Sequence, residues 1–130
     1  MSTTSINIHQ AAVPLATGMG LLGIGGGIYS LINPVAFSDG FGIPITSPSS
    51  PALPFVSFAG ARNLTSGISG LLLLYSGQRK AAGLAMMSGV TTAMIDSWIC
   101  AEYGAKKGKA ASHAIMGIVI GVIGGGLYWG

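Results

Sequence analysis

Two ionisable residues, Arg62 and Asp96, interrupt stretches of sequence that are otherwise apolar enough to cross a membrane. A charge at bilayer depth costs roughly 2.5 kcal/mol or more unless it is paired or faces water. Asp96 can accept or donate a proton, and Arg62 can stabilise a carboxylate or the charge that develops on an oxygen. We therefore expect each residue to be the partner of the other, and the pair to be the first candidate for acid–base chemistry.

A third candidate is His113, because an imidazole titrates near neutral pH and is suited to carry a second proton. Substrate positioning is expected from five further side chains: Tyr29, Asn33, Asn63, Trp98 and Glu102. Plainer alternatives stay open for most of them. The charged pair can be a structural ion pair that fixes the helix register. His113 can cap a helix, Asn63 can bond a neighbouring helix, and Trp98 and Glu102 can be groups at a membrane interface.

The composition favours a membrane protein over a soluble one. Of the 130 residues, 7% are charged and 50% are hydrophobic, whereas soluble domains carry roughly 25% charged residues. Most of the six basic residues lie in short clusters, a pattern typical of loops beside a membrane and not of a nucleic-acid interface. We expect an integral membrane protein, in the endoplasmic reticulum or another endomembrane if the source is eukaryotic. Membrane lipid is then an expected partner, and nucleic acid is not.

No cofactor or metal is expected from the sequence. The single cysteine, Cys100, excludes an internal disulfide. The two histidines, His9 and His113, are far apart and lack the spacing of metal ligands. The glycine-rich strings do not follow a strand and no Lys-Ser/Thr follows them, so they are not phosphate-binding loops.

Four apolar segments of about 20 residues predict an all-α, integral membrane four-helix bundle. It forms a single domain over residues 1–130, with residues 1–10 as a polar tail. The expected helices run from about Ala11 to Ile32, Ala52 to Ser76, Ala81 to Tyr103 and Ser112 to Trp129. Residues 33–51, rich in Pro, Gly and Ser, form the one long connection. Because the other two connections are short, the second, third and fourth helices are expected to be antiparallel neighbours.

This topology places the strongly polar residues in one half of the bundle. Arg62 lies about ten residues, or roughly 15 Å, from the face that holds the long connection. Asp96 lies roughly 10 Å from the same face, and His113 starts the fourth helix there. The opposite half holds the apolar ranges 71–74, 85–87 and 120–126. We expect a polar cavity that opens toward the first face, with an apolar floor of Gly, Leu and Met.

Glycines recur every four residues on two of the segments. Gly23 and Gly27 do so on the first, and Gly117, Gly121 and Gly125 on the fourth. Small residues at this spacing let membrane helices approach closely. Packing within the chain is the reading we favour, and the alternative is a homo-oligomer through Gly117, Gly121 and Gly125.

Several short motifs together resemble the family of small four-helix membrane proteins catalogued as domain of unknown function 4267. The matching elements, in order, are Asn33–Phe37, Gly40–Pro44, Gly60–Asn63, Asp96 and His113. The resemblance extends from about Gly18 to Tyr128. Members occur in bacteria and in fungal secondary-metabolite clusters, where relatives are associated with epoxide formation or opening on polyketide and terpenoid intermediates. The resemblance therefore implies a biosynthetic role of this kind.

Two functions from different classes follow from these observations. The first is a cofactor-free membrane enzyme of secondary-metabolite biosynthesis that acts on a lipophilic oxygenated small molecule. Epoxide opening by hydrolysis or cyclisation is the expected reaction, and isomerisation would need the same groups. Its catalytic residues would be Asp96, Arg62 and His113. The second is a non-catalytic membrane binder, carrier or accessory protein in which Arg62 and Asp96 form a structural ion pair.

Overall fold

The computed structural model describes residues 8–130, and every regular element in that range is a helix. The helices are α1 (Ile8–Ile32), α2 (Pro34–Phe41), α3 (Leu53–Tyr75), α4 (Arg79–Tyr103) and α5 (Lys107–Trp129). The all-α prediction is confirmed over the described range, and the long helices lie where the four apolar segments predict them. Of the predicted polar tail, residues 1–7 lie outside the described residues, whereas residues 8–10 belong to α1.

The long first connection contains a helix that the sequence analysis expected to be a loop. Asn33 caps α2, since its side-chain oxygen accepts a hydrogen bond from the Ala36 amide at 3.2 Å, and Pro34 occupies the first turn. Both residue types are favoured at the start of a helix. The same Asn-Pro step that ends α1 therefore also begins α2. The helix ends at Gly42, which has a left-handed φ of 113°, a conformation that glycine adopts without strain.

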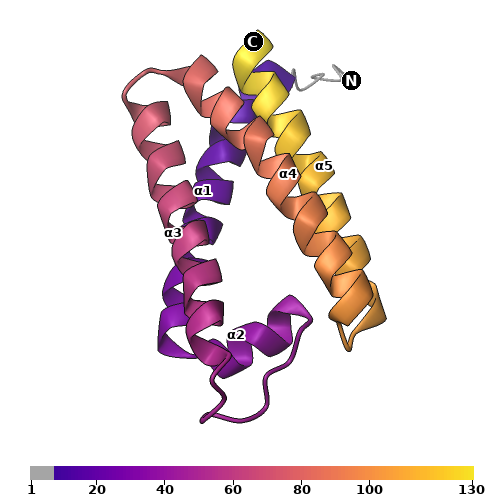
Figure 1. Ribbon diagram of the computed structural model, residues 1–130. Helices are drawn as coiled ribbons and strands as arrows, with labels where there is room; N and C mark the ends of the chain where they lie inside the picture. The colour runs from indigo at the N-terminus through magenta and orange to yellow at the C-terminus, as the bar shows by residue number, and fades with distance from the viewer. Residues whose placement is uncertain (1–7) are drawn as a thin grey trace, which may run out of the picture.

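The four long helices form two pairs that meet at one end and diverge toward the other (Figure 1). Helix α1 packs along α3, and α4 packs along α5, whereas α3 and α4 contact each other much less. The prediction that the second, third and fourth long helices are antiparallel neighbours is thus confirmed for α4 and α5, whereas α3 contacts α4 only lightly and packs mainly against α1. Helix α2 lies across the divergent end, which we call the open end.

Glycines explain why α3 packs on α1. Gly20 and Gly27 of α1 face Gly67 and Gly60 of α3, and a Cβ at Gly27 would lie 2.8 Å from the Gly60 carbonyl oxygen. A Cβ at Gly60 would overlap the Ser30 hydroxyl. The two backbones therefore approach closely because neither carries a side chain at these positions.

Glycines also hold α4 against α5. A Cβ at Gly83 would lie 2.6 Å from the Gly124 carbonyl oxygen, and Gly117 packs against Ala93. The Cβ position of Gly121 lies 3.3 Å from Val90. The favoured reading of packing within the chain is confirmed for these positions. Gly117 and Gly121 pack against α4, whereas the Cβ position of Gly125 meets only Trp129 of its own helix.

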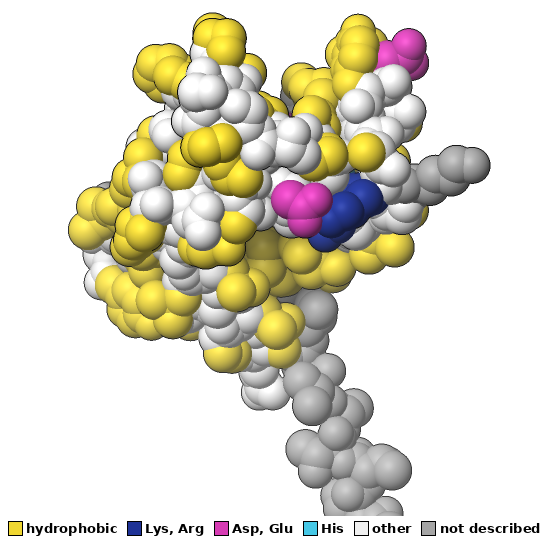
Figure 2. Space-filling model, turned by 90° about the horizontal axis from the view of Figure 1, so that it is seen from below, with side chains coloured by type: hydrophobic (Ala, Val, Ile, Leu, Met, Phe, Trp, Pro, Cys, Tyr) yellow, Lys and Arg dark blue, Asp and Glu magenta, His cyan; other side chains and the backbone are white. Residues whose placement is uncertain are grey.

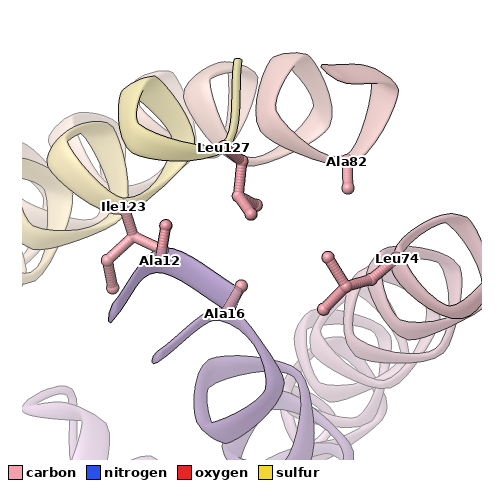
Figure 3. Packing of buried hydrophobic residues seen from close by; sticks show 6 residues of the cluster. All are labelled: Ala12, Ala16, Leu74, Ala82, Ile123 and Leu127. Atoms are coloured by element: carbon pink, nitrogen blue, oxygen red, sulfur yellow. The ribbon is translucent and has the colours of Figure 1, made fainter. Parts of the chain in front are cut away.

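The converging end of the helices, which we call the closed end, holds a small apolar core. Figure 3 shows its side chains pointing toward one another from all four long helices. The core residues are Ala12, Ala16, Leu74, Ala82, Ile123 and Leu127. Leu127 is 1% exposed. The start of α1 and the end of α5 lie together at this end (Figure 1).

Within residues 8–130, three helices are long and apolar enough to cross a membrane: Gln10–Ile32, Arg79–Tyr103 and Gly108–Trp129. The prediction of membrane-spanning segments is confirmed in length and composition for these three helices; α3 is not among them, because its polar side chains lower its mean hydropathy. Large hydrophobic side chains, including Ile32, Phe58 and Ile118, are exposed on the surface of the bundle. On the face of Figure 2, hydrophobic side chains likewise surround a few charged ones. An outer surface of this kind is typical of a membrane protein.

Candidate functional site

A cavity of about 760 Å³ lies between the two helix pairs and is lined by α1 to α5. Its wall includes Tyr29, Asn63, Asp96 and His113 from the predicted set. Toward the closed end it is lined by apolar residues that include Leu74, Met86 and Ile120. The divergence of the helix pairs creates this space, because the glycine contacts bind each pair together but leave the pairs apart.

The predicted ion pair is present at the cavity wall. Arg62 Nη2 donates a hydrogen bond to Asp96 Oδ2 at 2.9 Å, joining α3 to α4. The Asp96 side chain is 12% exposed and that of Arg62 is 39% exposed. Asp96 lines the cavity. Arg62 does not line it, and contacts Asp96 from outside the lining. The carboxylate is thus fixed in position by one charged hydrogen bond, and among the described residues no group donates to its second oxygen.

Helix α2 covers the open end of the cavity and is bonded to α4, to α5 and to the connection between them. His113 Nε2 lies 3.0 Å from the Phe41 carbonyl oxygen, and its ring lies 4.5 Å from the Phe41 ring. A carbonyl oxygen only accepts hydrogen bonds, so Nε2 carries a hydrogen and the neutral ring keeps Nδ1 as its acceptor. Cys100 Sγ donates to the same oxygen at 3.5 Å. Lys106 pairs with Asp39 at 2.7 Å.

The structure separates the other predicted substrate-binding residues into two groups. Tyr29 and Asn63 line the cavity, and Tyr29 contacts Phe37 edge-on. The remaining three are outside the cavity lining. Asn33 caps α2, Trp98 is 59% exposed and packs edge-on against Tyr103, and Glu102 is exposed.

The family model described as "Domain of unknown function (DUF4267)" matches residues 20–127. The chain belongs to this family. The match spans α2, the ion pair, His113 and most of both helix pairs, so it covers the cavity lining except for Ala16 and Met19. No curated protein and no solved structure matches the chain. The DUF4267 assignment confirms the resemblance inferred from the short motifs.

Two sets of cavity residues in this DUF4267 chain lie outside the predicted site. Phe37, Gly40 and Phe41 come from α2, which was expected to be a loop; for Phe37 and Phe41 the sequence left open a place on the membrane surface or over a cavity, and the structure shows the second. Hydroxyl side chains also enter the wall from α3 and α4: Thr65, Ser66, Ser69, Ser88 and Thr92. Some of these lie in the half that was expected to be an apolar floor. Their spacing from Arg62 and Asp96 in multiples of a helical turn was the signal that could have found them.

The described residues offer no obvious metal site. Between residues 8 and 130, no three side chains of His, Cys, Asp or Glu come together in a way that could hold a metal ion. The cavity wall provides a carboxylate, an imidazole and several hydroxyls among apolar side chains, and the carboxylate is bonded to the guanidinium group of Arg62. Such a wall is suited to an apolar molecule that carries a few oxygen atoms.

Proposed function

We propose that this chain is a small integral membrane enzyme that performs cofactor-free acid–base chemistry on a lipophilic, oxygenated molecule. The observation that carries the proposal is Asp96, a largely buried carboxylate that faces a cavity of about 760 Å³ while Arg62 holds it at 2.9 Å. Ionisable groups that combine burial, a charged partner and access to a cavity are candidates for catalysis.

All four long helices cross the membrane in this proposal, including α3. Its 23 residues are sufficient in length, and its polar residues Asn63, Ser66 and Ser69 face the cavity. Polar groups within membrane helices are tolerated where they face a bundle interior or a cavity. The bilayer would then supply the lipophilic substrate directly to the cavity between the helix pairs.

Epoxide opening is the reaction we propose, because of the family association given above. Asp96 takes a proton from water or from a hydroxyl of the substrate, and the oxygen attacks an epoxide carbon as the carbon–oxygen bond of the ring breaks. Arg62 stabilises the negative charge on the released oxygen. That oxygen then takes a proton from protonated His113 or from water. The product is a diol when water attacks and an oxygen-containing ring when an internal hydroxyl attacks.

The test is turnover of a panel of lipophilic terpenoid and polyketide epoxides in membranes that carry each variant. Asp96→Asn keeps the volume and hydrogen bonding of the side chain but removes the proton acceptor, so we expect turnover to fall by about 10²–10⁴-fold. Arg62→Lys is also expected to impair turnover, because an ammonium group does not reproduce the planar guanidinium. Asp39→Asn is the matched control, since Asp39 pairs with Lys106 and does not line the cavity.

A non-catalytic binder, carrier or accessory protein is the second candidate. It is favoured by the position of the ion pair, which joins α3 to α4 where these helices otherwise contact each other little. The exchanged pair, Arg62→Asp with Asp96→Arg, separates the two functions. If the pair is only structural, the exchange restores stability and ligand binding together. If Asp96 is catalytic, the exchanged protein folds and turnover stays lost. Wild-type turnover in Asp96→Asn would refute the catalytic proposal.

A further inference from the structure

The ion pair is the first of three polar levels in the cavity. Ser66 follows Arg62 by four residues on α3, and Thr92 precedes Asp96 by four residues on the antiparallel helix α4. Both hydroxyls are therefore about 6 Å from the ion pair along the helix axes, at the same height. Ser69 and Ser88 continue these two stripes at about 10–12 Å. All four of these hydroxyl residues line the cavity.

The hydroxyls of this wall are available to a ligand. Over residues 8–130, the side chains of Ser66, Ser69 and Thr92 make no hydrogen bond to the protein. The Ser88 hydroxyl donates to the Ala85 carbonyl oxygen at 2.7 Å and keeps its acceptor capacity. Serine and threonine within helices commonly bond to the preceding turn of their own backbone. Ser66, Ser69 and Thr92 do not make such a bond. Their hydroxyls are therefore free to donate hydrogen bonds to a molecule in the cavity.

A lipid with one polar head and a hydrocarbon tail would form hydrogen bonds with only one of the three polar levels. The other two would then face apolar carbon, and a polar group that loses water without gaining a partner costs about 1–3 kcal/mol. A ligand with oxygens at matching intervals satisfies all of them. Gly67 and Gly89 line the cavity between the polar levels and leave room for its carbon skeleton.

We propose that the part of the cavity between α3 and α4 binds a lipophilic molecule with two or more hydroxyl, ether or carbonyl oxygens along one edge. One oxygen lies at Arg62 and Asp96, and another lies about 10–12 Å away at Ser69 and Ser88. This inference rests on the proposed function in taking the cavity as the substrate site, and it defines the class of substrate. It makes Ser69 and Ser88 determinants of affinity and specificity, with no part in the chemical step.

The test compares two labelled probes that share one rigid skeleton. One is a saturated steroid diol with a hydroxyl at each end of its four-ring skeleton, and the other is the matching mono-alcohol. Retention by the protein in lipid nanodiscs is measured against empty nanodiscs. We expect the wild-type protein to bind the diol about tenfold more tightly than the mono-alcohol. Ser69→Ala with Ser88→Ala should reduce diol binding to the level of the mono-alcohol and leave mono-alcohol binding unchanged.

Thr91→Val is the matched control, because Thr91 is the exposed neighbour of Thr92 on α4 and does not line the cavity. It should keep the preference for the diol. Equal binding of the two probes by the wild-type protein would overturn the inference, as would a preference that survives in the double variant. The binding measurement does not depend on turnover. Full turnover by Asp96→Asn with an intact diol preference would therefore refute the catalytic proposal alone.

Discussion

The two partners of the Arg62–Asp96 pair differ in burial, so removing each should cost a different free energy of unfolding. Arg62→Ala leaves a carboxylate whose side chain is only 12% exposed without its one charged partner. Breaking a buried pair in this way costs about 3–5 kcal/mol, and the partial exposure of Arg62 places the expected loss near the lower end. Asp96→Asn leaves a guanidinium that is 39% exposed and free to move outward, so we expect a loss of about 1–2 kcal/mol.

The double variant Arg62→Ala with Asp96→Asn completes the cycle. It should cost less than the two single variants together, by about 1–2 kcal/mol, because it leaves no unpaired charge. The free energy of unfolding can be measured by titrating micelle-bound protein with sodium dodecyl sulfate while following the helical circular dichroism signal. Lys106→Ala is the control, since the Lys106–Asp39 pair is about half exposed on both sides and should contribute less than about 1 kcal/mol. Additive losses, or an Arg62→Ala loss no larger than that of Lys106→Ala, would refute the reasoning.

Two further predictions concern the glycines that set the shape of the cavity. Gly60→Ala places a methyl group on the Ser30 hydroxyl and should lower the free energy of unfolding by about 1–3 kcal/mol; Ser30→Gly should recover part of this loss in the same titration, and failure to do so would contradict the packing of α1 on α3. Gly42→Ala combines a strained positive φ with a contact on Lys109, so it should loosen α2 at a cost of about 1–3 kcal/mol. Maleimide labelling of Cys100 should then become faster, because Cys100 is buried and bonds to Phe41; an unchanged labelling rate would refute the proposed attachment of α2.

The long helices and the ion pair could be predicted from the sequence because both depend on strong local signals. Apolar runs of about 20 residues bounded by Pro, Gly and polar residues mark helices whatever their neighbours are. Arg62 and Asp96 are costly in such runs, and the short connection between α3 and α4 leaves few other partners for either. The connectivity places the two at similar depth, which is why their contact at 2.9 Å follows from counting residues along the helices.

The remainder of the site depends on which helix faces pack together, and only the tertiary structure decides this. Glycine patterns on α1 and α5 indicate close packing but do not name the partner helix, because any glycine-lined face is compatible with any other. The match of Gly27 with Gly60, and of Gly83 with Gly124, places α3 on α1 and separates the two pairs. Helix α2 was missed because its start signal, Asn33-Pro34, is also the signal that ends α1. Serine and threonine cost little in a helix, so their positions in the sequence gave no reason to expect a polar wall. The three polar levels form only because the fold brings the polar residues of α3 and those of α4 to the same cavity.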